Sequence, residues 1–194
     1  RLDSARMFDA SFFDFSTADA RFLDPQQRIL MECAWTALED AACMPEQIEG
    51  MVGVFCSIGS NDYISGAFQS QDTNWAQAYK LFLGNSLDLA STHLSYKLNI
   101  NGPSLNVLSG CSSTLAAIHV ARQSLLMREC DMALVGGAVL NIENEFGCMY
   151  NDGGLLSPDG HCRAFDAGAQ GGVNGSACGV VVLKRLNEAL VDGD

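Results

Sequence analysis

Basic residues are scarce in this sequence, which has 11 Lys and Arg against 23 Asp and Glu and a net charge of −12. Such a chain offers no basic patch to engage phosphates, so no nucleic-acid partner is expected. No apolar run reaches membrane-spanning length, so no membrane partner is expected either. With 48% hydrophobic and 18% charged residues, the composition fits a compact domain, for which we expect a cytoplasmic location.

Paired cysteine motifs and nucleotide-binding glycine motifs are also missing. The eight cysteines are irregularly spaced and include no C-x-x-C pair, which argues against a zinc site and a dense disulfide framework. We interpret Cys33, Cys56, Cys130 and Cys178 as reduced core residues, and the pattern leaves Cys148 and Cys162 unassigned. No G-x-G-x-x-G or P-loop string follows an apolar run, so nucleotide binding has little support. We expect neither a cofactor nor a metal.

Short apolar runs alternate with amphipathic stretches along most of the chain, which predicts a layered α/β sheet with helices on both faces. The expected strands are residues 52–56, 105–109, 132–139 and 180–183, and the expected helices are residues 26–42, 87–98 and 112–127. The first, third and fourth of these strands are almost continuously apolar, as in strands covered on both faces.

One cysteine lies where a strand is expected to turn into a helix. In Gly110-Cys111-Ser112-Ser113, the glycine permits a tight turn and either serine can cap the helix, whose Leu115, Ile118, Arg122 and Leu125 fall near helical spacing. The first helical N–H groups lack intrahelical partners and the helix dipole presents its positive end there, so a thiolate is stabilised. Cys111 is therefore a candidate nucleophile, although a free cysteine is more often a packing residue.

The residues around this thiol resemble the nucleophile segment of β-ketoacyl synthase domains, the condensing enzymes of polyketide and fatty-acid synthesis. Residues 101–104 and 109–115 carry the resemblance, and further blocks agree in family order. These blocks are residues 24–28 (Asp-Pro-Gln-Gln-Arg), 34–40, 84–86, 129–137 and 156–166. The first and last are more similar to modular type I polyketide synthases than to free-standing fatty-acid enzymes.

The resemblance implies a thiolase-like fold, of which residues 1–194 form the N-terminal half, without its first strand and without the C-terminal half. In the intact enzyme it implies that Cys111 accepts an acyl chain from an acyl carrier protein as a thioester. A malonyl-type extender then loses carbon dioxide and condenses with that thioester. It also implies a homodimer formed through the strand from Leu105 to Ser109.

The two histidines that family members use for condensation lie in motifs resembling His-Gly-Thr-Gly-Thr and Asn-x-Gly-His, and neither string occurs here. His119 is eight residues beyond Cys111, roughly 12 Å along a helix, and is expected to be buried. His93 and His161 are expected to have structural or solvated roles. The chain alone is thus expected to be acylated but not to condense.

Two features are expected to matter for partners and pocket. An acidic carrier protein needs basic residues, and the candidates are Arg122, Arg128, Lys184 and Arg185. Phe146, Met149 and Tyr150 are candidate wall residues of the acyl pocket.

Two other functions stay open at this point. One is a non-condensing acyltransferase of the same fold, which keeps the cysteine and lacks the histidines. The other is a catalytically silent dimer partner or scaffold, against which the retained Cys111 argues. Four phenylalanines near Asp14 and Asp19 predict a surface helix that packs its rings on the body and carries no chemistry.

Overall fold

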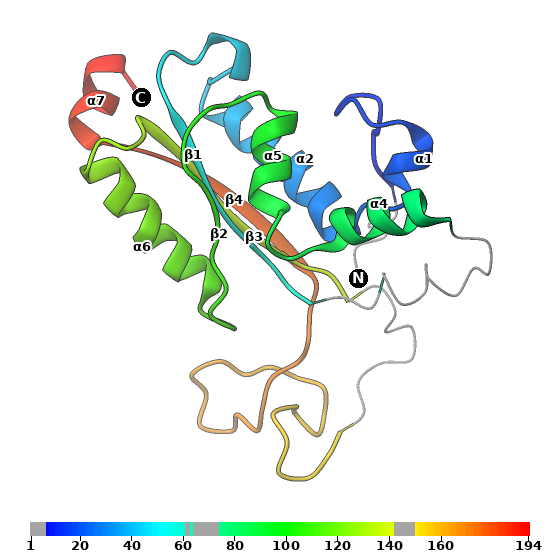
Figure 1. The fold of residues 1–194 in the computed structure, drawn as a ribbon. Coiled ribbons are helices and arrows are strands. Elements are labelled where there is room, and N and C mark those ends of the chain that lie inside the picture. Colours follow the sequence, from blue (N-terminus) through cyan, green and yellow to red (C-terminus); the bar gives the residue numbers. More distant parts are fainter. Residues whose placement is uncertain (1–6, 61–62, 64–73, 142–149) are drawn as a thin grey trace.

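The computed structural model describes residues 7–60, 63, 74–141 and 150–194 as a four-stranded sheet with helices around it (Figure 1). Pro25 stands at the first turn of the longest helix, where Asp24 caps it by accepting a hydrogen bond from the Gln26 N–H at 2.8 Å. The elements in chain order are α1 Thr17–Ala20, α2 Pro25–Asp40, η1 Pro45–Gln47, β1 Val52–Ile58, α4 Trp75–Asn85, α5 Ala90–Lys97, β2 Ser104–Asn106, α6 Ser113–Leu126, β3 Met132–Val139, β4 Ala177–Lys184 and α7 Leu186–Asp192.

The strands lie in the order β2-β1-β3-β4. β1 is parallel to β2 and to β3, with Val54 opposite Ser104 and Val52 opposite Met132. β4 runs antiparallel to β3, so the sheet is mixed. All four predicted strands are present, but β2 is shorter than predicted and ends at Asn106.

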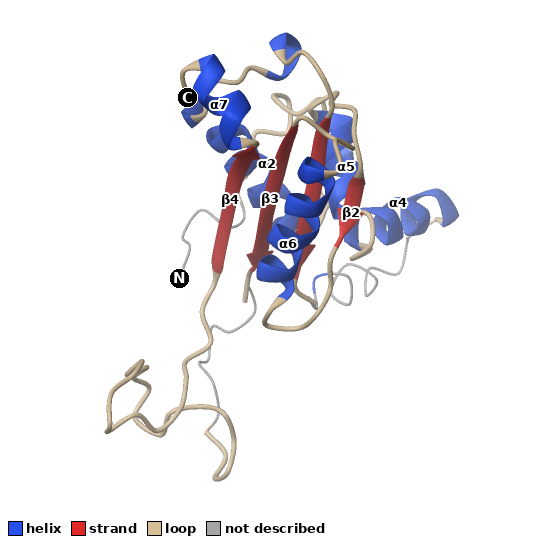
Figure 2. Cartoon of the chain, turned by 90° about the vertical axis from the view of Figure 1, so that its left-hand side faces the viewer, coloured by secondary structure: helices blue, strands red, loops and turns tan. Residues whose placement is uncertain are grey.

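Helices cover both faces of the sheet, as predicted. α2 and α5 lie on one face and α6 lies on the other (Figures 1 and 2). The α2 and α5 face encloses the larger part of the core, including Leu30, Leu94 and Val54. The α6 face encloses a smaller cluster in which Ala117 and Ala121 pack against Phe55.

The prediction that β4 is covered on both faces is wrong. β1 is buried along its whole length, whereas exposure alternates along β4 and Val181 is 47% exposed. β4 is the edge strand of the sheet, and α2 packs on only one of its faces, with Cys178, Val180 and Val182. On the other face, only Leu183 packs on the α6 cluster, so an apolar sequence here does not indicate two-sided burial.

The aromatic N-terminal segment packs on the body, as predicted, but most of it is not helical. Only Thr17–Ala20 form a helical turn, while Phe13 is buried and stacks on Phe8. α4 was not predicted at all, although Asn74 and Gln77 form a capping box at its start. Among the described residues, no helix is long and apolar enough to cross a membrane.

Candidate active site

Cys111 lies in the turn between β2 and α6 and is exposed. The chain leaves the sheet after the Val107 N–H donates to the carbonyl of Cys56 at 2.9 Å. Gly110 then adopts φ +65°, a left-handed conformation that side chains rarely adopt, and a Cβ there would meet nothing within 4 Å. The backbone angle, and not crowding, therefore requires glycine before the nucleophile candidate.

Two serines hold this turn together through hydrogen bonds. The prediction that the side chain of one of them caps the helix is wrong. Ser112 is the N-cap residue of α6, yet its side chain makes no capping bond and donates instead to the carbonyl of Ser109 at 2.9 Å. The Ser113 hydroxyl accepts from the Ser109 N–H at 2.8 Å and donates to the carbonyl of Gly110 at 2.7 Å. Both hydroxyls point back into the turn because its carbonyls and N–H groups, and not those of the helix, are within reach.

A hollow of about 270 Å³ lies beside Cys111. The turn and the first residues of α6 form one side, and the ends of β1, β3 and β4 form the other. Gly137 lets the two sides approach, because a Cβ on it would lie 2.6 Å from Thr114 Oγ1 and 2.8 Å from Ser57 Oγ. The lining residues are Ser57, Ile58, Gly59, Gly110, Cys111, Ser113, Thr114, Gly137, Ala138, Val139, Ala177, Cys178 and Gly179.

The start of α6 gives this hollow its electrostatic character. α6 is 14 residues long, and its first turn lies directly after Cys111. The Ser113 N–H already donates to the carbonyl of Gly110 at 3.2 Å, but the positive end of the helix dipole still favours negative charge at that point. A thiolate, or the oxyanion of a thioester under attack, is the kind of charge that such a site stabilises.

None of the three histidines lines the hollow. His119 lies on α6 but is exposed, so the prediction that it is buried is wrong: Ala117 and Ala121 form the face that packs on the sheet, and His119 lies between them on the outer side. His93 contacts Gln27 through Nδ1 at 2.9 Å, and burial lowers its pKa. His161 is exposed in a loop and its Nδ1 lies 2.8 Å from the carbonyl of Asp159, which fits the predicted structural or solvated role.

The seven described cysteines are free, and five of them are at least partly buried. Burial raises the pKa of the Cys56 thiol to about 12 and also raises that of Cys130 and of Cys178, so these thiols stay protonated. Cys111 and Cys162 are the exposed ones. Cys148 lies outside the described residues.

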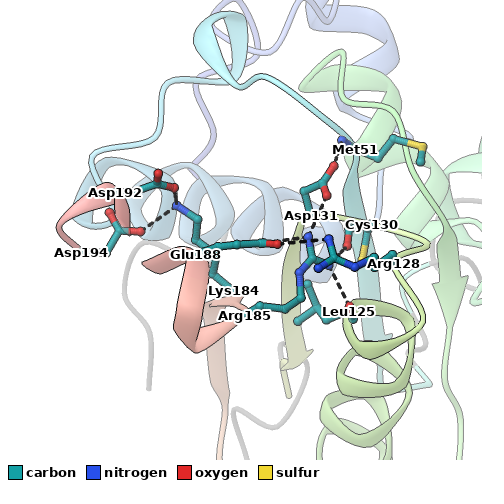
Figure 3. A network of polar contacts seen from close by, with 10 residues as sticks. All are labelled: Met51, Leu125, Arg128, Cys130, Asp131, Lys184, Arg185, Glu188, Asp192 and Asp194. Atoms are coloured by element: carbon teal, nitrogen blue, oxygen red, sulfur yellow. Dashed lines mark hydrogen bonds and ion pairs between the residues drawn. The ribbon is translucent and has the colours of Figure 1, made fainter. Parts of the chain in front are cut away.

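The four candidate docking cations have different environments, and Figure 3 shows three of them. Arg185 is 12% exposed and donates to the carbonyls of Leu125 and Cys130 and to Asp131. Lys184 pairs with Asp192 and Asp194. Arg128 is exposed and lies 3.5 Å from Glu188. Arg122 is exposed and, within the part of the chain that the structure describes, has no such partner.

Of the three candidate wall residues, the structure describes only Tyr150. Phe146 and Met149 lie outside the described residues. Tyr150 is 48% exposed and donates to Asp152 at 3.3 Å. Sequence reasoning missed the actual lining of the hollow, which is mostly backbone and small residues at strand ends. The paired glycines at 136 and 137 were the available signal, since such pairs allow close backbone approach.

Comparison with known proteins extends this description. The sequence matches the family described as "Beta-ketoacyl synthase, N-terminal domain" over residues 1–189. It is 42% identical over 202 residues to a phenolphthiocerol/phthiocerol polyketide synthase polypeptide of Mycobacterium tuberculosis, covering 100% of this chain and 14% of that protein. It is 41% identical to phthioceranic/hydroxyphthioceranic acid synthase of Mycobacterium bovis, covering 100% of this chain and 9% of that protein. The chain thus spans only a small part of these relatives.

Solved structures of ketosynthases are also similar to this chain. Ketosynthase twelve from the bacillaene polyketide synthase of Bacillus amyloliquefaciens superposes with a TM-score of 0.91 at 35% identity, covering 99% of this chain and 34% of that one. The ketosynthase of module 1 of the bacillaene synthase from the same species superposes with a TM-score of 0.85 at 38% identity, covering 99% of this chain and 34% of that one. The fold is therefore thiolase-like, and the described sheet and helices correspond to part of a ketosynthase domain.

Proposed function

Since the chain belongs to the family of β-ketoacyl synthase N-terminal domains, we propose that it presents the acyl-accepting thiol, Cys111, of a polyketide ketosynthase. The observation that carries this proposal is an exposed cysteine at the start of α6, next to a hollow lined by strand ends. Buried thiols such as Cys56 are poor candidates, because burial holds them protonated.

The proposed reaction is an exchange of thioesters. The Cys111 thiolate attacks the carbonyl carbon of an acyl group carried on the thiol of an acyl carrier protein. The carbonyl oxygen takes the negative charge at the N-terminus of α6, where the helix dipole and the first N–H groups stabilise it. The carbon–sulfur bond to the carrier breaks, the carrier leaves as a thiolate and takes up a proton, and the acyl group stays on Cys111.

Condensation with a malonyl-type extender is the second half of the proposed activity. It requires groups that promote decarboxylation and stabilise a second oxyanion. None of His93, His119 and His161 lines the hollow. We therefore propose that residues 1–194 act as the N-terminal half of a ketosynthase domain and that residues outside them supply these groups.

A second copy of the chain is the proposed structural partner. β2 is an edge strand, and among the described residues nothing pairs with its outer edge. Leu105 in this strand is 49% exposed and Leu108 just after it is 53% exposed. Unpaired, apolar edge strands favour pairing with another chain. A homodimer through the segment from Leu105 to Ser109 is part of the proposal, and a monomer at high concentration in a sizing experiment counts against it.

The acyl carrier protein is the second proposed partner. Of the four candidate docking cations, Lys184 and Arg185 are held by carboxylates of this chain, and Arg128 lies near Glu188. Arg122, on the exposed side of α6, is the candidate left for a local contact with an acidic carrier.

The cytoplasmic location stays a prediction.

The test is to incubate the purified chain with an acyl carrier thioester and then with a malonyl carrier thioester. We expect an acyl adduct on the chain, absent from Cys111→Ala and present in Cys162→Ala, which removes the other thiol that is exposed among the described cysteines. We expect no β-ketoacyl product. An adduct that persists in Cys111→Ala overturns the assignment of the nucleophile, and a β-ketoacyl product from these 194 residues overturns the proposed division of labour.

A further inference from the structure

The sequence block at residues 24–28 forms a buried polar cluster on the opposite side of the strand ends from Cys111. Gln26 is 0% exposed and Gln27 is 1% exposed. Fully buried amides are costly unless hydrogen-bonded, and both are bonded here. The two side chains, adjacent in sequence and equal in kind, reach different parts of the chain.

Gln26 bridges the ends of two parallel strands. Its Nε2 donates to the carbonyl of Gly59, directly after β1, at 2.8 Å. Its Oε1 accepts from the N–H of Leu140, directly after β3, at 3.2 Å. Nε2 also donates to Asp24 at 3.1 Å, which orients the amide so that its donor and its acceptor each face the correct strand.

The bridged residues belong to the wall of the hollow beside Cys111. Gly59 lines it, and so does Val139, the neighbour of Leu140. The two strand ends are further joined by the Gly59 N–H, which donates to the carbonyl of Ala138 at 3.0 Å. Gln26 does not line the hollow, so any effect it has on a bound group passes through this wall.

Gln27 makes an internal comparison possible. Its Nε2 donates to the carbonyl of Gly84 at 3.0 Å, and its Oε1 contacts His93. Neither Gly84 nor His93 lines the hollow. Loss of either amide removes buried hydrogen bonds, but only loss of the Gln26 amide releases the wall.

We propose that Gln26 is a positioning residue that fixes the spacing of the β1 and β3 ends and so sets which acyl groups fit beside Cys111. This inference rests on the proposed function. In this proposal, an acyl chain longer than acetyl extends from Cys111 along the wall formed by Gly59 and Val139, whereas acetyl reaches little beyond the turn. Release of the wall therefore penalises long acyl groups more than short ones.

The experiment compares wild type, Gln26→Leu and the matched control Gln27→Leu. Intact mass spectrometry gives the rates of Cys111 acylation by the N-acetylcysteamine thioesters of acetate and of octanoate. We expect Gln26→Leu to lower the octanoyl-to-acetyl rate ratio roughly tenfold, because small misplacements of a binding wall have effects of this order or larger. Gln27→Leu is expected to keep the ratio within about twofold, and alkylation of Cys111 by iodoacetamide is expected to stay unchanged in both.

Gly59→Ala provides a second route if Gln26→Leu does not fold. A Cβ on Gly59 would lie 3.1 Å from Val139 Cγ2 and 3.2 Å from Gln26 Oε1, so one of these neighbours must shift and the same wall is disturbed. The same fall in the rate ratio is expected. An unchanged ratio in the folded Gln26 or Gly59 variant, or an equal fall in Gln27→Leu, overturns the inference while leaving the proposed function intact. Absence of acylation in wild type overturns both.

Discussion

Replacing either serine of the cysteine turn tests the hydrogen bonding seen there. Ser113 is 9% exposed and exchanges two hydrogen bonds with the turn, at 2.8 Å to Ser109 and 2.7 Å to Gly110. Each neutral bond contributes about 1 kcal/mol net, and the partner groups are exposed enough to bond to water after the change. Alanine gains back about 0.5 kcal/mol in helix propensity. Ser113→Ala should therefore destabilise the protein by about 1.5 kcal/mol.

Ser112→Ala is the matched control, one residue away and of identical chemistry. A serine that caps a helix costs about 1 kcal/mol when replaced by alanine. The Ser112 side chain makes no capping bond, and its bond to the Ser109 carbonyl is exposed, so the expected cost is below about 0.5 kcal/mol.

Urea denaturation gives both values, provided that the slope m is unchanged between variants. The reasoning is refuted if Ser112→Ala is the more damaging change, because Ser112 would then be a true cap. It is also refuted if Ser113→Ala lies within about 0.5 kcal/mol of wild type. Ser113→Ala should further slow acylation of Cys111 by about threefold to tenfold, since the turn that holds the thiol is loosened.

Three further predictions concern the sheet and its ion pairs. Arg185→Met should destabilise the protein by about 3 kcal/mol in urea denaturation, because it removes a largely buried cation that is bonded to two carbonyls and two carboxylates. The control Arg128→Met removes an exposed cation and should cost less than about 0.5 kcal/mol. The pKa of Asp131 is lowered by a backbone hydrogen bond from Met51 and by Arg185. The ionised Asp131 should therefore stabilise the fold above the ordinary pKa of 3.8, and this stabilisation should be lost as the pH falls below that value. Asp131→Asn should make the free energy of unfolding less dependent on pH in this acidic range. Gly137→Ala places a Cβ 2.6 Å from an α6 hydroxyl and should slow acylation of Cys111 by about tenfold or more, whereas Gly175→Ala meets nothing and should leave the rate unchanged.

Much of the fold follows from local pattern. The apolar run of β3 predicted its bounds without error, since the strand is central and its neighbours on both sides are strands. The turn at Cys111 was also predictable, because a glycine between an apolar run and a helical stretch has few other uses. The edge position of β4 was not, because its sequence is as apolar as that of a covered strand.

The buried face of α6 shows a second limit of sequence pattern. Hydrophobicity favoured a stripe through Leu115, Ile118 and Leu125, yet Leu115 is 73% exposed. The face that packs on the sheet is formed by Ala117, Ala121 and Leu125. Small side chains let the helix approach the sheet closely, and a hydropathy scale ranks them below leucine although they pack better here.

The candidate site shows a third limit, because its parts are distant in sequence. The hollow joins residues near 58, 111, 138 and 178, and Gln26 fixes two of these segments from behind. A single sequence shows that the segment at 24–28 is polar and begins a helix. Only the tertiary arrangement shows that its amides are buried and which strand ends they join.

The most direct test of the central claim compares, within one molecule, the two thiols that are exposed among the described cysteines. The protein is treated with an acyl N-acetylcysteamine thioester, quenched at intervals and digested, and the acyl groups on the Cys111 and Cys162 peptides are counted by mass spectrometry. Because Cys111 lies at the start of a 14-residue helix and Cys162 lies in an exposed loop, we expect Cys111 to be acylated at least about tenfold faster. Equal rates, or faster acylation of Cys162, would contradict the claim that the turn before α6 makes Cys111 the nucleophile.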